Sequence, residues 1–410
     1  MKSKQPTFGV LDFSDFRLFL GYRIALILAM QIIGVAVYWQ IDNLTHDALQ
    51  LGLVATSEVV PAITLGLLGG YLTDTFNRKN LVIAGMFSAF LAMAVLIIFA
   101  GEKNPETVIP FHAAMIIIGI TRGFMSPAAA VLSANIVPQQ FIGRAAVFNS
   151  IAFHLASVLG PAFAGLIIAK WGVAWTYRIS ALLAILSTAF IVFIKGYTHT
   201  KSAREKMSDS IKNGLKFVFS KQIILASLSL DLFAVLLGGA IGILALFTRE
   251  VLHEGADVFG LLRSAPAIGA ALMGTVLIFF PIQKKAGRIL LASVALFGVC
   301  WIIFAFSTSV WLCVFLLALT GAFDNISVVM RATIVQAYTP DNMRGRVASV
   351  NSIFIASSNE IGTLESGFAA RFFGLVNSIA IGGALTIMVV LTTWYNAPKL
   401  RNLDLSESQK

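Results

Sequence analysis

Charged residues in the middle of long apolar runs are the residues of this sequence best placed to do chemistry. Arg122, Asp231 and Asp324 each lie about 14–16 Å from the predicted cytoplasmic end of such a run, at 1.5 Å per helical residue. Glu58 and Glu360 lie about 21 Å into two further runs. Charged side chains are costly inside a membrane and mark functional positions by default. These five residues therefore form the candidate site.

The chemistry open to this set is the binding and release of a proton. Burial raises the pKa of a carboxyl group, and a neighbouring arginine lowers it again. Arg122, Asp231 and Asp324 together hold one more acid than base, so we expect one of the carboxylates to exchange a proton. The alternative is a set of structural ion pairs that hold helices in register. Asp324-Asn325 with Arg331 could likewise be polar residues that hold the tenth predicted helix against its neighbours.

The elements that carry these residues are predicted to be membrane-spanning helices. Hydrophobic residues make up 58% of the 410 residues and charged residues 12%, whereas soluble domains have about 45–50% and about 25%. Only helices or closed barrels satisfy their backbone hydrogen bonds in lipid, and a spanning helix needs about 20 apolar residues. We predict an all-α membrane protein with twelve transmembrane helices, at residues 17–40, 47–72, 80–101, 109–133, 146–169, 174–194, 222–248, 256–281, 288–307, 310–333, 346–370 and 376–397.

The basic residues fix the predicted orientation. With both termini in the cytoplasm, 21 Lys and Arg residues fall in or at the edge of cytoplasmic segments, counting Arg17, Arg288 and Arg346 at the first position of a span, and four fall in external segments, as the positive-inside rule requires. The net charge of +10 is therefore a feature of membrane loops, and no nucleic-acid partner is expected. The histidines and the two cysteines, Cys300 and Cys313, show no metal-ligand spacing. We expect no metal and no cofactor.

A polar segment divides the chain into two halves. The predicted domains are a six-helix bundle at 1–194, a cytoplasmic linker at 195–221 and a second six-helix bundle at 222–410. Within the linker, Ile211, Leu215, Val218 and Phe219 recur at helical spacing, which predicts a short helix on the membrane surface. A merely solvated helix is the alternative.

The two halves are related in sequence. Pro138, Gly143 and Arg144 lead into Asn149-Ser150-Ile151, and Pro340, Gly345 and Arg346 lead into Asn351-Ser352-Ile353, always 202 residues later. A shift across six helices leaves both copies on the same side of the membrane. The sequence thus predicts a parallel repeat with pseudo-two-fold symmetry, as found between the halves of many transporters.

The loop between the second and third predicted helices carries a specific motif. Gly69-Gly70-Tyr71-Leu72-Thr73-Asp74-Thr75-Phe76-Asn77-Arg78-Lys79 resembles the Gly-x-x-x-Asp-x-x-Gly-Arg-Lys/Arg loop of the major facilitator superfamily. Asn77 replaces the usual glycine, and we expect the turn to survive because Asn tolerates positive φ. Since carboxylates favour helix N-termini, we expect Asp74 to approach the helix that starts near Gly345. The predicted cytoplasmic gate comprises Gly70, Asp74, Arg78, Lys79, Gly143, Arg144, Gly345 and Arg346.

Further strings narrow the resemblance. Arg122-Gly123 is similar to the arginine motif of helix 4, and Gly160-Pro161-Ala162-Phe163-Ala164-Gly165 resembles the Gly-Pro motif of antiporters, although small residues also serve ordinary packing. The chain resembles the proton-linked exporters that include macrolide-efflux and enterobactin-export carriers, through three strings: Asp15–Phe19, Leu230–Gly239 and Ser358–Gly367.

This resemblance implies a function. It implies alternating access, a central cavity lined by helices 1, 4, 7 and 10, and proton-coupled efflux of a drug-like or siderophore-like molecule through a bacterial inner membrane. An importer or lipid flippase of the same fold is the first alternative, and a membrane receptor or enzyme the second. The expected partners are a small-molecule substrate, protons and the lipid bilayer. The expected assembly is a monomer.

Overall fold

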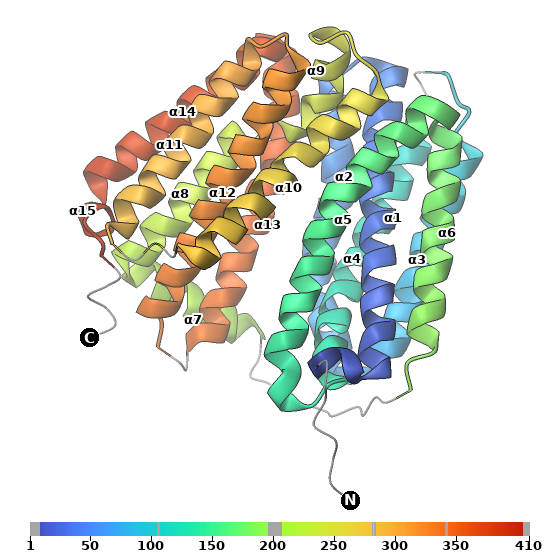
Figure 1. Ribbon diagram of the computed structural model, residues 1–410, viewed down its shortest axis with the longest axis horizontal. Coiled ribbons are helices and arrows are strands. Elements are labelled where there is room, and N and C mark those ends of the chain that lie inside the picture. Colours follow the sequence, from blue (N-terminus) through green and yellow to red (C-terminus); the bar gives the residue numbers. More distant parts are fainter. Residues whose placement is uncertain are drawn as a thin grey trace, which may run out of the picture. The chain divides into compact units, whose positions relative to one another are not determined.

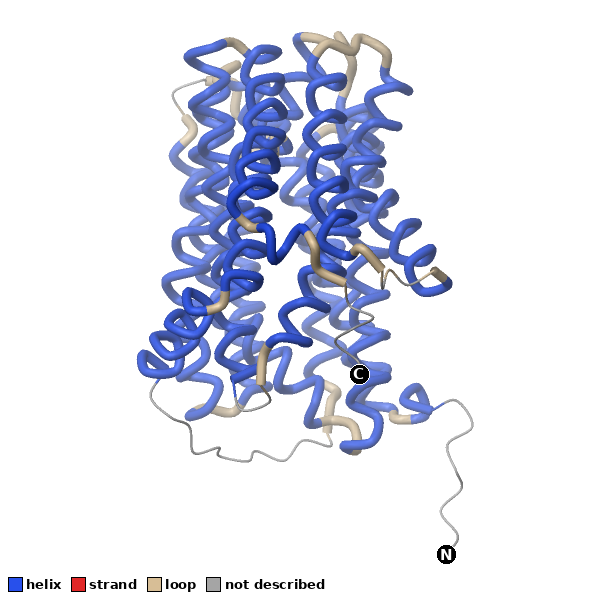
Figure 2. Tube along the Cα trace, turned by 90° about the vertical axis from the view of Figure 1, so that its left-hand side faces the viewer, coloured by secondary structure: helices blue, strands red, loops and turns tan. Residues whose placement is uncertain are grey.

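The structure is a computed structural model in which the regular elements of the described residues are all helices (Figures 1 and 2). It describes residues 9–104, 107–195, 207–280, 282, 284–340 and 343–404. Within these ranges, the side chains of 67–71, 74, 207–211, 344, 345, 348, 349, 352, 353, 356, 357, 359 and 360 are not described.

The first half of the chain folds into six long helices. A short 3-10 turn at Gly9–Asp12 precedes them. They are α1 (Ser14–Thr45), α2 (Ala48–Thr75), α3 (Arg78–Ile98), α4 (Ile109–Asn135), α5 (Ile142–Trp171) and α6 (Val173–Val192).

The second half repeats this series after a linker helix. Its elements are α7 (Met207–Ser220), α8 (Gln222–Gly238), α9 (Leu244–Glu250), α10 (Ala256–Phe279), α11 (Ala286–Ala305), α12 (Val310–Tyr338), α13 (Arg344–Phe373), α14 (Leu375–Asn396) and α15 (Pro398–Arg401). Every predicted span coincides with helical structure, and no predicted end differs by more than five residues from the helix end.

Among the described residues, twelve helical segments are long enough to cross a bilayer when α8 and α9 count as one. Eleven also meet an apolar criterion over the described residues, with α8 and α9 together counting as the seventh. The remaining segment, α13, has 30 residues and is more polar, since its sequence includes Asn351 and Glu365. At 1.5 Å per residue it is about 45 Å long, ample for an apolar core of about 30 Å. The predicted twelve-helix, all-α membrane fold is confirmed.

The seventh span is interrupted, which the apolar pattern did not predict. The α8 helix ends at Gly238, Gly239 is extended, and a 3-10 turn at Ile241–Ile243 leads into α9. Two consecutive glycines each weaken a helix interior by about 1 kcal/mol relative to alanine. The two glycines therefore explain the break. The hydropathy pattern does not predict it, because the residues on both sides of the break are apolar.

Helix packing within each half follows one scheme. In the first half α1 packs against α5 and α6, and α3 packs against α4 and α6. In the second half α8 packs against α13 and α14, and α11 packs against α12 and α14. A shift of six spans converts the first set of pairs into the second, as the parallel sequence repeat predicts.

By internal contacts the chain forms two compact units. The first comprises Met1–His46, Leu53–Ser202 and Gly255–Ser264, and the second comprises Asp47–Gly52, Ala203–Glu254 and Ala265–Lys410. The first turn of α2 thus packs with the second unit, and the first part of α10 packs with the first unit.

The linker helix α7 docks on protein through its apolar face. A Cβ at Gly214 would lie 2.7 Å from the Arg346 carbonyl oxygen of α13. Val218 is fully buried beside Ile224, Val347 and Val350. The predicted helix is therefore present, and Leu215 and Val218 pack in a protein core. Phe219 is exposed, and the side chain of Ile211 lies outside the described residues. The expected place of this helix on the membrane surface stays a prediction.

Candidate functional site

In the first unit, an ion pair joins α2 to α4. The Arg122 guanidinium contacts the Glu58 carboxylate, with 49% and 20% of the two side chains exposed. Glycine makes this contact possible, because a Cβ at Gly119 would overlap the Glu58 carbonyl oxygen. The backbones of the two helices therefore approach closely at the level where the charged side chains meet.

In the second unit, a more buried ion pair joins α8 to α12. Arg331 contacts the Asp231 carboxylate, and only 3% and 8% of these side chains are exposed. Removing two charges from water is expensive unless each compensates the other. The Asp231–Arg331 pair is therefore much less exposed to solvent than the Glu58–Arg122 pair.

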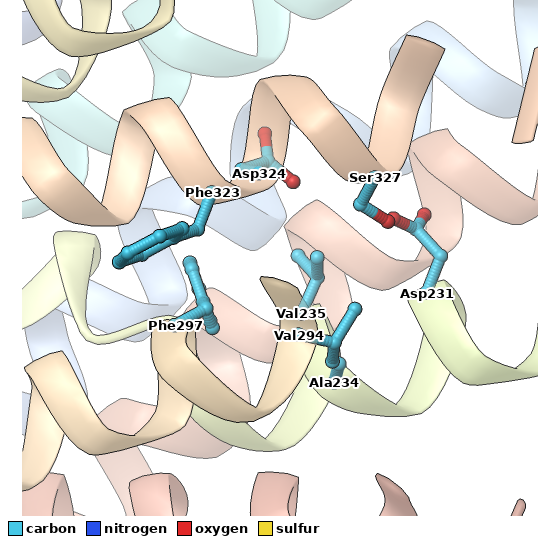
Figure 3. A pocket seen from close by; sticks show the side chains of 8 residues that line it. All are labelled: Asp231, Ala234, Val235, Val294, Phe297, Phe323, Asp324 and Ser327. Atoms are coloured by element: carbon cyan, nitrogen blue, oxygen red, sulfur yellow. The ribbon is translucent and has the colours of Figure 1, made fainter. Parts of the chain in front are cut away.

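A small cavity lies beside the Asp231–Arg331 pair, between α8, α11 and α12 (Figure 3). Asp324 and Ser327 reach it from α12, and Asp231 reaches it from α8. The Ser327 hydroxyl is buried and has no hydrogen-bond partner among the described residues. Asp324 is partly buried, and the described part of the chain offers it neither a hydrogen bond nor an ion pair.

The charges predicted as one set are thus distributed over two pairs and one additional carboxylate. Arg122 pairs with Glu58, and the arginine that pairs with Asp231 is Arg331. For Arg331 the sequence predicts only a polar contact with Asp324-Asn325 of the same helix. The side chain of Glu360 lies outside the described residues.

Two polar residues near these charges, Arg331 and His112, were not in the predicted site. Arg331 lies seven residues after Asp324, which places both on one face of a helix. That spacing was the available signal for a shared site. In the first unit, His112 Nδ1 lies 2.9 Å from the Ser57 hydroxyl, one residue from Glu58. His112 falls inside the predicted span 109–133, but a single histidine in an apolar run does not by itself predict a functional site.

The loop that resembles the superfamily motif is built as a helix junction. Asn77 has a φ of −64° and accepts hydrogen bonds from the backbone N–H groups of Lys79, at 3.0 Å, and Asn80. Asn77 is the N-cap of α3 and has a negative φ, so its tolerance of positive φ is not what this position requires. Asparagine suits the site because its side chain supplies an acceptor that glycine lacks.

Both basic residues of this motif contact backbone carbonyl groups. Arg78 is buried and donates to the Thr73 carbonyl oxygen at 3.3 Å. Lys79 donates to the carbonyl oxygens of Val192 and Ile194, both at 2.7 Å, at the end of α6. A cation at a helix C-terminus stabilises the helix dipole. The side chains of Gly70 and Asp74 lie outside the described residues, and the expected approach of Asp74 to Gly345 stays a prediction.

The matching loops of the repeat are only partly described. Arg144 lies over the Phe141 ring, 5.9 Å from its centroid, and its guanidinium lies close to Gly9. Gly143 has open space around it. Arg346 lies 3.4 Å from the Met343 sulfur, whereas Gly345 is outside the described side chains.

The Gly-Pro motif of α5 mediates close helix packing. Gly160 packs against Gln31 of α1, while Pro161 and Gly165 pack against Gly260 of α10. In α13, Gly362 and Gly367 stand 202 residues after Gly160 and Gly165. Gly362 packs against Leu236 of α8, and Gly367 against Ala48 and Gly52 of α2. The repeat therefore preserves both crossings, each within one unit.

Comparison with known proteins gives the same fold and a family. A family model described as transmembrane secretion effector matches residues 11–410. The enterobactin exporter EntS of Escherichia coli O81 (strain ED1a) is 25% identical over 391 residues, covering 92% of this chain and 90% of the relative. EntS of Citrobacter koseri is 26% identical with the same coverage.

Solved structures of transporters share the fold at low identity. The POT family transporter PepTSo superposes with a TM-score of 0.76 at 12% identity, over 96% of this chain and 99% of that one. A D-xylose–proton symporter superposes with a TM-score of 0.74 at 15% identity, over 96% and 100%. These neighbours and relatives are transporters, which confirms the prediction that the chain is not an enzyme.

Proposed function

Because the chain belongs to the transmembrane secretion effector family of the major facilitator superfamily, we propose that it exports an organic small molecule in exchange for protons. The observation that carries the coupling is Asp324, a carboxylate inside a membrane-spanning helix that borders a cavity and has no cation partner among the described residues. Such a group is costly to keep charged, so it favours proton binding. The relatives named as enterobactin exporters support the outward direction.

The proposed mechanism is alternating access. In transporters built from repeated halves, the two halves rock about a site near the bilayer midplane. Arg122, Asp231, Asp324, Glu58 and Glu360 are the proposed coupling and cavity residues. Protonation of a carboxylate changes its ion pairing, so proton binding and substrate binding can favour different states. The loops with Asp74 and Gly345 are the proposed cytoplasmic gate.

The proposed substrate is a siderophore-like or drug-like organic compound, and the proposed location is a bacterial inner membrane. The substrate class follows from the relatives' names and from nothing in the cavity itself. An importer or flippase of the same fold is the second candidate, since solved neighbours include a D-xylose–proton symporter. The direction of the proton gradient that drives accumulation separates these candidates.

Proteoliposomes with an imposed pH gradient test this function. Enterobactin is the probe, with a panel of cationic dyes alongside it. An exchanger should accumulate the probe when the lumen is acidic, and a protonophore should abolish the accumulation. Accumulation driven only by an acidic exterior would instead establish proton-coupled uptake. Equilibration unaffected by either gradient would contradict coupling.

A further inference from the structure

We propose that Asp324, Ser327, Asp231 and Arg331 form a proton relay inside the second unit, in which one water molecule carries a proton from Asp324 to Asp231 and so releases Arg331. This inference rests on the proposed proton coupling and specifies its site. It assigns the coupling to one unit alone and gives Arg331 the role of a positioning residue for Asp231.

The α12 helix presents three of these residues on one face. Asp324, Ser327 and Arg331 stand at positions i, i+3 and i+7, which are neighbours along a helix surface. Asp231 of α8 meets this face, because it pairs with Arg331 and lines the same cavity as Ser327 and Asp324 (Figure 3). Asp324, Ser327 and Asp231 therefore border one cavity between the two helices, and Arg331 is paired with Asp231.

The cavity between Asp324 and Asp231 has the size of one water molecule. Its volume is about 10 Å³, near the lower limit at which a cavity holds a single water. A buried water also needs two to four polar partners. The two carboxylates and the unpartnered Ser327 hydroxyl provide them. Buried hydroxyl groups normally have partners, and a water in this cavity would supply one for Ser327.

The surroundings contain few other charges. The α11 helix contributes Val294 and Phe297 to the cavity. The α10 helix packs on α12 at Gly269 and Gly321, and its sequence from 266 to 279 has no charged residue. The α14 helix has none either, and α8 has only Asp231. The α11 helix also carries Arg288 in its first turn, and α13, which packs on α8, carries Glu360 and Glu365. Glu365 lines a separate pocket with Gly238 and Ser378, and the side chain of Glu360 lies outside the described residues. Among the described residues, the charged groups that line this cavity are Asp231 and Asp324, with Arg331 paired to Asp231.

The proton balance of the relay is simple. Asp324 is more exposed than Asp231, which has 6% of its surface exposed, so an incoming proton reaches Asp324 first. Neutral Asp324 donates this proton to the water, and the water gives another to Asp231. Asp324 is then a carboxylate again, Asp231 is neutral, and Arg331 loses its anionic partner. Arg331 is thereby free to turn along its helix face toward Asp324.

This transfer would weaken the link between α8 and α12. A buried arginine without a counter-ion is strongly disfavoured, so protonation of Asp231 favours a rearranged position of Arg331 or of the helix.

The cavity suits a proton better than a metal cation. Hard cations such as Mg²⁺ and Ca²⁺ take about six or more oxygen ligands, and this cavity offers two carboxylates and one hydroxyl.

The sharpest test compares two serine substitutions. Ser327→Ala removes only the hydroxyl that holds the water. Ser293→Ala is the matched control, because Ser293 is equally buried in the same unit but bonds to Leu290 of its own helix. We expect Ser327→Ala to lower accumulation driven by a pH gradient by about two- to tenfold, the range for one lost hydrogen bond. Exchange without a gradient should remain, and Ser293→Ala should behave as the unsubstituted protein.

Asp324→Asn and Asp231→Asn complete the test. Infrared difference spectra between mildly acidic and mildly alkaline pH should show a protonated carboxyl band that each substitution alters. This measurement needs no substrate. Full coupling and unchanged bands in both variants would overturn the relay while leaving export intact. Absence of both gradient-driven transport and any such band in the unsubstituted protein would instead defeat the proposed proton coupling itself. Dependence on a sodium gradient would also overturn the proton assignment.

Discussion

Arg122 and Arg331 each contact a carboxylate of another helix, but their surroundings differ. Half of the Arg122 side chain is exposed, whereas Arg331 and Asp231 are almost fully enclosed. Exposed ion pairs contribute about 0–1 kcal/mol. Breaking a buried pair from one side costs about 3–5 kcal/mol, because the remaining charge has no compensation. The two pairs should therefore respond differently to the same substitution.

Stability measurements test this difference. Arg331→Met should destabilise the protein by about 3–5 kcal/mol, and the double variant Asp231→Asn with Arg331→Met should recover most of the loss. Arg122→Met is the comparison and should cost about 1 kcal/mol or less. Cys300 and Cys313 are free and buried, so heating in detergent with a thiol-reactive dye reports unfolding. Equal unfolding temperatures for Arg331→Met and Arg122→Met would contradict this interpretation.

Asn77 provides a second prediction at the level of one side chain. Its side chain caps α3 through Lys79 and Asn80, so Asn77→Ala should lower stability by about 0.5–2 kcal/mol. Asn77→Asp keeps the acceptor and should be near neutral, and Asn77→Gly should cost only a few tenths of a kcal/mol. The same thiol assay measures all three. A larger loss with glycine than with alanine would argue against capping.

At the scale of elements, closely packed helices depend on glycines rather than on charges. A Cβ on Gly260 would overlap the Pro161 carbonyl oxygen, and one on Gly165 would overlap that of Ala256. The repeat provides the equivalent crossing of α13 with α2 at Gly367 and Gly52. The sequence motif indicated close packing at Gly160 and Gly165, but it did not identify the partner helices. Those depend on contacts between segments about a hundred residues apart.

Alanine substitutions distinguish these glycines from unconstrained ones. Alanine normally stabilises a helix interior by about 0.5–1 kcal/mol relative to glycine. Gly34 of α1 has no atom within 4 Å of an added Cβ, so Gly34→Ala should be neutral or stabilising. Gly165→Ala and Gly260→Ala should instead destabilise by about 1–3 kcal/mol through overpacking. Unfolding temperatures of the purified variants decide the matter, and a gain in stability at Gly165 would refute the close contact.

For the molecule as a whole, hydropathy and charge predicted most of the fold. The spans could be predicted because lipid requires long apolar helices. The repeat could be predicted because the residues around Gly143 and Gly345 match. Hydropathy did not predict the break in the seventh span, because Gly238 and Gly239 carry no polar side chain and do not interrupt the apolar run. The pairing of Asp231 with Arg331 could not be derived, because it depends on the rotation of α8 against α12. Sequence depth estimates fix a level in the membrane but not a face of a helix.

Charge asymmetry yields the last prediction, which concerns orientation. Cytoplasmic segments are assigned 21 basic residues and external ones four, and translocating extra lysines and arginines is unfavourable. Both termini and the 195–221 linker should therefore lie in the cytoplasm. In a background with Cys300 and Cys313 replaced by alanine, single cysteines at Lys103 and Ser202 should behave oppositely toward an impermeant thiol reagent in cells with a permeable outer envelope and an intact inner membrane. Lys103→Cys should react at once, and Ser202→Cys only after the inner membrane is disrupted. Successive loops lie on opposite sides of the membrane. The reverse result would therefore invert every external and cytoplasmic assignment and place the Asp74 loop outside.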